Sequence, residues 1–143
     1  MIAYADTGFL ISLYGQDSNS ASAISLLTPR PVLLLTPFSE VEFLNVVELI
    51  VFRKEWTRSQ AKVVLDIFRQ HQGADVFRTI PVVPEIWEKA LALSSRHSAT
   101  LGTRTLDVLH VATALVVKPD MFFSFDVRQR KLARAVQLRL LPS

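Results

Sequence analysis

Four acidic residues occupy apolar stretches of a chain that is basic overall. Asp6, Glu42, Asp107 and Asp126 each lie inside or at the edge of a hydrophobic run, although the isoelectric point of the sequence is about 9.6. An ionised carboxylate that leaves water destabilises the fold unless a cation, a metal ion or hydrogen-bond donors compensate it. Four such groups in one small protein predict a divalent-metal site that cleaves a polyanion.

The predicted chemistry is phosphodiester hydrolysis with Mg²⁺ or Mn²⁺. Neighbouring carboxylates repel one another, so some stay protonated unless a cation neutralises them. Both metal ions prefer oxygen ligands, retain waters, and bind through few carboxylates plus the phosphate of a substrate. In such a site the metal ion activates a water molecule and stabilises the charge that develops at phosphorus. We therefore assign the four acids as metal ligands and as catalytic residues.

Each acid also has a structural explanation. The first and last acids are predicted at strand-to-helix junctions, where an aspartate caps the first turn of a helix. Glu42 and Asp107 lie within predicted helices, where we expect no capping role, so their alternative is a buried ion pair. Arg104 and His110 each stand three residues from Asp107 and offer such a pair, whereas no basic residue lies within one turn of Glu42. The metal-site hypothesis therefore depends most on Glu42 and Asp107.

Composition limits the kind of protein this is. The chain has 143 residues, half of them hydrophobic, which fits a single domain over residues 1–143 with one core. The sequence contains no cysteine, which excludes disulfides, thiolate catalysis and cysteine-based metal centres, and is compatible with a reducing cytoplasm. His71, His97 and His110 do not have the spacing of a zinc site.

No segment predicts export or a membrane span. The first residues, MIAYADTGFLISLY, lack the basic region and the cleavage site of a signal peptide. The most apolar region, residues 32–52, is interrupted by one proline and three glutamates. We expect a soluble, cytoplasmic protein.

The elements that must position the acids alternate along the chain. Short apolar runs predict strands, and amphipathic or apolar stretches bounded by proline and glycine predict helices. The predicted strands cover 2–5, 32–36, 76–83, 121–125 and 138–141, and the predicted helices cover 9–14, 21–27, 37–52, 59–72, 85–96, 105–117 and 127–136, with a loop at 98–103. This order predicts a three-layer α/β/α sandwich around a mainly parallel five-stranded sheet.

A parallel sheet would gather the acids at one edge. Ligands bind at the carboxyl ends of the strands in such folds, and Asp6 and Asp126 follow two predicted strands directly. Arginines stand close to the acids in the sequence. Arg104, Arg128 and Arg130 are candidate contacts for substrate phosphates, with a plain surface charge as the alternative for each.

Four segments carry a resemblance to a known family. The segments AYADTGFLISLY, TPFSEVEFLNVV, RTLDVLHVATAL and FFSFDVRQRKLARAVQL resemble, in order and spacing, the motifs of PIN-domain ribonucleases, particularly the VapC-like toxins of bacterial toxin–antitoxin pairs. The resemblance implies that the four acids bind the metal and that Thr7 and Ser124 are accompanying hydroxyl positions. It also implies cleavage of RNA with Mg²⁺ or Mn²⁺, a homodimer, and inhibition by a small antitoxin protein.

Other acidic α/β sites lack residues that they require. A phosphatase of the haloacid dehalogenase type needs an acid two residues after Asp6, where the chain has Gly8. Four scattered glycines do not form a phosphate-binding loop. The remaining alternative is a PIN-like module that binds RNA or a protein without cutting. For His110 we expect a hydrogen bond that orients Asp107, or packing, rather than a general-base role.

Overall fold

The computed structural model describes residues 1–143 and contains one sheet of five parallel strands in the order β3-β2-β1-β4-β5. The strands are β1 Ile2–Ala5, β2 Val32–Leu35, β3 Phe77–Thr79, β4 Met121–Phe123 and β5 Leu140–Leu141. The helices are α1 Thr7–Tyr14, α2 Ser20–Ser25, α3 Pro37–Phe52, α4 Arg58–Gln72, α5 Pro84–Leu93, the π-helical turn η1 Ser94–Ser98, α6 Ala99–Leu101, α7 Thr105–Val117 and α8 Val127–Ala135. The predicted α/β/α sandwich is confirmed, with a sheet that is parallel throughout.

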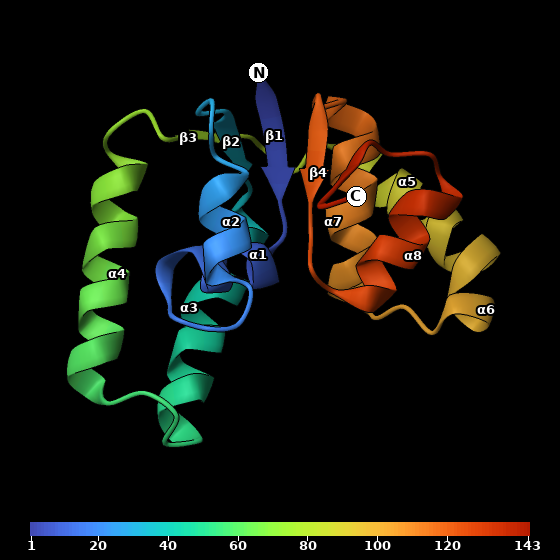
Figure 1. The fold of residues 1–143 in the computed structure, drawn as a ribbon. Helices are drawn as coiled ribbons and strands as arrows, with labels where there is room; N and C mark the ends of the chain where they lie inside the picture. The colour runs from blue at the N-terminus through green and yellow to red at the C-terminus, as the bar shows by residue number, and fades with distance from the viewer.

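Helices cover both faces of the sheet. Figure 1 shows α1 to α4 on one side and α5 to α8 on the other. Alternate side chains of β1 point to opposite faces, so Ala3 and Ala5 join the core under α1 to α4 while Tyr4 joins the core under α5, α7 and α8. None of the helices has both the length and the apolar character that a bilayer crossing requires.

Side-chain caps fix where the helices begin. Thr36 accepts a hydrogen bond from the Ser39 amide, and Pro37 occupies the first turn of α3. Asp6 and Asp126 cap α1 and α8 in the same way. The helix that carries Glu42 and the two helices that follow the acidic strand ends are therefore fixed in register by local sequence.

Several predicted boundaries were wrong. β4 ends at Phe123 rather than at residue 125, and β5 begins at Leu140 rather than at residue 138. β3 ends at Thr79 rather than at residue 83, because Pro81 and Pro84 lack the amide hydrogen that a further ladder bond requires. The predicted loop at residues 98–103 is helical as far as Leu101. The chain leaves this helix only at Gly102, which has a φ of 66° and lies in the left-handed region that glycine adopts without strain.

Candidate active site

Asp6 and Asp126 lie at the carboxyl ends of adjacent strands. β1 and β4 pair in parallel with Ala5 opposite Phe123, and the Asp6 amide donates to the Phe123 carbonyl over 3.0 Å. The Oδ1 atom of Asp6 caps the Phe9 amide at 2.6 Å, and Oδ1 of Asp126 caps the Gln129 amide at 3.0 Å. Each capping bond uses one carboxylate oxygen, so the role of cap leaves the second oxygen, Oδ2, for another partner.

The second oxygen of Asp6 has no hydrogen-bond partner. Asp6 is fully buried, and its Oδ2 atom accepts no bond from any protein group. Burial disfavours the ionised form and raises the pKa of Asp6 to about 6. A buried carboxylate oxygen without a donor is costly, so this atom requires a proton, a water molecule or a cation.

Arg104 joins two of the acids. Its Nε atom lies 3.2 Å from Oδ2 of Asp107, and its Nη2 atom lies 3.4 Å from Oδ2 of Asp126. The hydrogen bonds with Asp107 raise the pKa of Arg104 above its ordinary value. The pairing expected from sequence between Arg104 and Asp107 is therefore present, and it extends to Asp126.

Asp107 caps its helix, contrary to the expectation from sequence. Its Oδ2 atom accepts a hydrogen bond from the Arg104 amide at 2.9 Å, so that it satisfies a free amide at the start of α7. The prediction failed because Asp107 lies in the first turn of α7, where a side chain can still reach back to the residue before the helix. The remaining oxygen, Oδ1, accepts from the Gln129 side chain at 3.2 Å.

Glu42 pairs with a histidine from another helix. Nε2 of His110 lies 2.8 Å from Oε1 of Glu42 and 3.5 Å from the Thr7 hydroxyl. Burial, the largest single effect, would raise the pKa of Glu42, but the interactions with His110 and Thr7 together outweigh it and hold this pKa below the ordinary value. The expected packing of His110 is present, since the residue is fully buried against Tyr4 and Phe38. The expected hydrogen bond to Asp107 is wrong, because the ring pairs with Glu42.

Two of the acids, Glu42 and Asp126, line one cavity of about 540 Å³, together with Thr7, Arg104 and Gln129 among others. Asp6 and Asp107 are buried and do not line it. Asp6 directly precedes the lining residue Thr7, and Asp107 contacts the lining residues Arg104 and Gln129. The negative charges of Asp6 and Asp126 repel one another, as do those of Glu42 and Asp107. The structure therefore brings all four sequence-predicted acids into one electrostatic cluster.

The residues present fit a hard divalent cation by their chemistry. As the side chains stand, no three acidic or histidine groups converge closely enough to hold a metal ion. The oxygens of Asp107 and Asp126 face Arg104, and one oxygen of Glu42 faces His110. The donor set nevertheless consists of carboxylate oxygens, and the unpaired Oδ2 of buried Asp6 is the kind of atom that such a cation satisfies.

The other predicted site residues have distinct roles. Buried Ser124 accepts a hydrogen bond from the Asp126 amide at 3.1 Å and so fixes the turn that carries this acid. Arg128 is exposed on α8. Arg130 donates to the carbonyls of Ser124 and Pro142 at 2.8 and 2.7 Å, so its guanidinium ties the end of β4 to the end of the chain.

Gln129 was missed by the sequence analysis. It is buried, its Nε2 atom donates to Asp107, and its Oε1 atom has no hydrogen-bond partner. The available signal was its position: Gln129 is three residues after Asp126, one turn into α8, and therefore faces the same side as the capping acid. A polar side chain at that position of an acid-capped helix was a candidate for the site.

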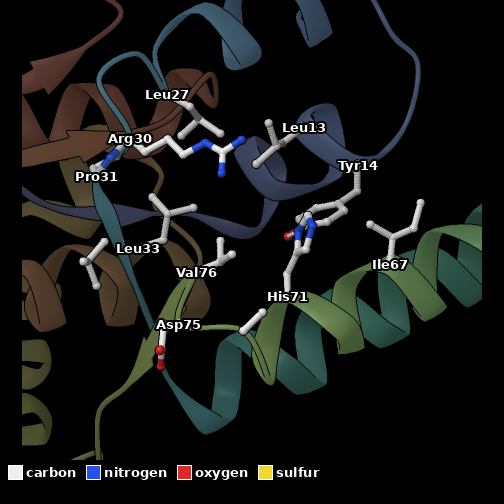
Figure 2. Close-up of a pocket in the computed structure, with 12 residues that line it drawn as sticks. Leu13, Tyr14, Leu27, Arg30, Pro31, Leu33, Ile67, His71, Asp75 and Val76 are labelled. Carbon is white, nitrogen blue, oxygen red and sulfur yellow. Dashed lines mark hydrogen bonds between the residues drawn. The ribbon is translucent and has the colours of Figure 1, made fainter.

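A second cavity lies at the opposite end of the sheet. Its volume is about 480 Å³, and it is lined mostly by hydrophobic residues near the amino ends of β2 and β3. Figure 2 shows Tyr14 and His71 together on its wall, and the Tyr14 hydroxyl lies 2.7 Å from Nδ1 of His71. None of the four acids lines this cavity, so the candidate active site is the acidic one.

Comparison with known families agrees with this geometry. The family model for the PIN domain matches residues 3–135, a span that includes all four acids. The chain belongs to the PIN domain family. A search of curated protein sequences gives no match.

Solved structures with the same PIN fold include three bacterial examples. VapC20 of Mycobacterium tuberculosis, a toxin that cleaves the sarcin–ricin loop, is 18% identical, with 90% of this chain and 93% of that chain covered and a TM-score of 0.69. FitAcB of Neisseria gonorrhoeae is 16% identical, with 98% and 96% covered and a TM-score of 0.72. A toxin–antitoxin complex from Klebsiella pneumoniae is 16% identical, with 89% and 88% covered and a TM-score of 0.58.

Proposed function

We propose that this PIN-domain protein is an endoribonuclease that depends on Mg²⁺ or Mn²⁺ and acts as the VapC-like toxin of a toxin–antitoxin pair. The observation that carries the proposal is the clustering of four acids, two of which line one cavity, with a buried Asp6 oxygen that lacks any partner. Family membership and the fold shared with a toxin that cleaves RNA support the same reading.

Asp6, Glu42, Asp107 and Asp126 would hold the metal ion. When bound, the ion lowers the pKa of a coordinated water and offsets negative charge on the scissile phosphate. Asp6 and Asp107 form the buried base of the site, where a low dielectric strengthens their attraction for a cation. Thr7 and Ser124 support this base, because the first contacts His110 and the second fixes the turn before Asp126.

Basic groups on the rim would bind the RNA. Arg104 lines the cavity with its side chain 62% exposed, so it can turn from the acids toward a phosphate. Exposed Arg128 on α8 adds a second positive charge. Arg130 on the same helix adds a third, although two of its N–H groups already donate to backbone carbonyls.

The proposed partners are an RNA substrate, a cognate antitoxin protein and a second copy of the chain, and the proposed location is the cytoplasm. The likeness to a solved toxin–antitoxin complex supports the antitoxin. The absence of cysteine suits a reducing compartment.

Cleavage assays with matched variants test the nuclease. Purified protein is incubated with several RNAs with and without Mg²⁺ or Mn²⁺, beside Glu42→Gln and Glu48→Gln. Both glutamates are on α3, but Glu48 forms a surface pair with Arg58 away from the acids. We expect cleavage only with metal, a loss of roughly 100-fold or more in Glu42→Gln, and normal cleavage in Glu48→Gln. Metal-independent cleavage contradicts the proposed metal site. No cleavage of any RNA contradicts the nuclease and favours a non-catalytic binding module.

The toxin role needs a separate experiment. Expression of the chain in a bacterial host should arrest growth, and Glu42→Gln should remove the arrest. Co-expression of a small protein encoded beside the gene should restore growth. Harmless expression of a protein that cleaves RNA in vitro would remove the toxin role and leave the enzyme.

A further inference from the structure

His110 is held by hydrogen bonds at both ring nitrogens. It is fully buried in α7, with Nδ1 2.8 Å from the Tyr4 hydroxyl and Nε2 2.8 Å from Oε1 of Glu42. The rings of Tyr4 and Phe38 contact the imidazole edge-on, with centroids 5.7 and 5.4 Å away. Because the imidazole is in contact on both sides and at both nitrogens, its ring is held in one orientation.

The partners decide which nitrogen carries the hydrogen. The Glu42 carboxylate can only accept, so Nε2 must be the donor in that bond. The Tyr4 phenol keeps its proton near neutral pH and can donate it to Nδ1. The neutral tautomer with hydrogen on Nε2 satisfies both bonds, whereas the other tautomer places two lone pairs opposite each other at Glu42.

The same bond fixes one half of the Glu42 carboxylate. Oε1 is occupied by His110, and the Glu42 side chain is 17% exposed where it reaches the acidic cavity. Oε2 is therefore the oxygen free to face a cation. Ligating carboxylates in metal sites are oriented by outer hydrogen bonds of this kind, and loss of such a partner weakens metal binding by roughly 10- to 100-fold.

We infer that His110 is a positioning residue that holds Glu42 ready for the metal ion, with Tyr4 as the group that orients its ring through Nδ1; this role rests on the proposed metal-dependent nuclease. The chain Tyr4–His110–Glu42 connects β1, α7 and α3, three elements that are far apart in sequence. His110 touches neither substrate nor metal in this role.

The chain supplies a matched control. Tyr14 and His71 form a second hydroxyl–imidazole pair of 2.7 Å at the opposite end of the sheet, where none of the acids lies. Tyr14→Phe removes the same kind of bond as Tyr4→Phe without approaching the site. Comparison of the two variants separates positioning of Glu42 from a general loss of buried hydrogen bonding.

Two measurements on the full chain test the inference. Long-range ¹H–¹⁵N spectra of the metal-free protein report the tautomer of each histidine, and electron paramagnetic resonance gives the affinity for Mn²⁺ alone. We expect hydrogen on Nε2 of His110, Mn²⁺ binding about 10- to 100-fold weaker in His110→Leu, and binding roughly two- to tenfold weaker in Tyr4→Phe. His110→Gln, whose amide can still donate to Glu42, should retain most of the affinity, and Tyr14→Phe all of it.

Two results would contradict the positioning role of His110. Hydrogen on Nδ1 in the unchanged protein, or equal weakening of Mn²⁺ binding by Tyr14→Phe and Tyr4→Phe, overturns the inference. If His110→Leu does not fold, the spectrum of the unchanged protein and the affinity of His110→Gln decide. Weaker Mn²⁺ binding in the variants of a protein that cuts no RNA would retain the positioning role and remove the ribonuclease.

Discussion

Arg104 reaches Asp126 across 22 residues of sequence, with Nη2 of the guanidinium 3.4 Å from Oδ2 of the carboxylate. The same guanidinium contacts Asp107, so it supplies positive charge to two of the four acids. A divalent cation and this guanidinium would neutralise the same oxygens. Metal binding and the inward position of Arg104 should therefore compete, and an outward Arg104 becomes available to phosphate.

Arg104→Gln should affect metal and RNA in opposite directions. Without RNA, the variant should bind Mn²⁺ more tightly, by about two- to fivefold, since the Arg104 side chain is 62% exposed and solvent screens its charge, so that it contributes about 1 kcal/mol. RNA binding at low salt should weaken, with a smaller dependence on salt concentration. Titration with Mn²⁺ and with labelled RNA measures the two effects. Weaker Mn²⁺ binding in the variant would show that Arg104 supports the acids rather than competing at them.

Asp6→Asn should stabilise the metal-free protein at neutral pH. The substitution keeps an oxygen for the Phe9 amide and removes a buried charge whose Oδ2 has no partner. We expect a gain of about 2–3 kcal/mol in unfolding free energy at pH 7, from a pKa raised by about two units. Urea unfolding in the presence of a chelator measures it. Added Mg²⁺ should reverse the order, because only the unchanged protein retains the carboxylate.

The pH dependence of stability follows from the same residue. The pKa of Asp6 is raised from 3.8 to about 6 in the folded protein, so the folded state holds the proton more tightly than the unfolded state. This contribution to stability is complete below pH 4 and is lost as the pH rises through 6. Unfolding of the metal-free protein between pH 4 and 7 should show this loss, and Asp6→Asn should not. A parallel decline in both proteins would assign the dependence to other groups.

Substitution of Arg130 should lower the stability of the protein, whereas substitution of Arg128 should weaken RNA binding. Arg130→Ala removes two charged hydrogen bonds to the carbonyls of Ser124 and Pro142, and we expect a loss of about 2 kcal/mol in unfolding free energy. Arg128→Ala removes an exposed charge on the same helix and should leave stability within about 0.5 kcal/mol while weakening RNA binding. Thermal unfolding and RNA titration of both variants measure the difference. If Arg130→Ala and Arg128→Ala have equal unfolding free energies, then water hydrogen-bonds to the two carbonyls as well as Arg130 does.

Removal of metal should be reversible. A chelator should abolish cleavage without unfolding the protein, because the two cores on either side of the sheet do not contain the acids. Addition of Mg²⁺ or Mn²⁺ should restore the rate. Circular dichroism beside the cleavage assay distinguishes this result from a metal that is needed for folding.

The sequence determined the elements and the identity of the acids. Three sequence signals extend over only one or two helical turns: the period of the apolar residues, the prolines at helix starts and the acids at strand ends. Because these signals are local, they can be recognised without knowledge of the fold. They predicted the order of strands and helices, the parallel sheet and the helix caps at Asp6 and Asp126. The roles of the acids in metal binding and catalysis stay predictions.

Only the tertiary structure decided which side chains meet. The bond between His110 and Glu42 spans 68 residues, and that between Gln129 and Asp107 spans 22. Such pairs depend on how separate helices pack on the sheet, which no local pattern encodes. The sequence thus showed that four carboxylates needed compensation and indicated Arg104 as a partner of Asp107. The fold determined that Arg104 also reaches Asp126, that a histidine and a glutamine from other helices supply further contacts, and that one oxygen of Asp6 stays unpaired.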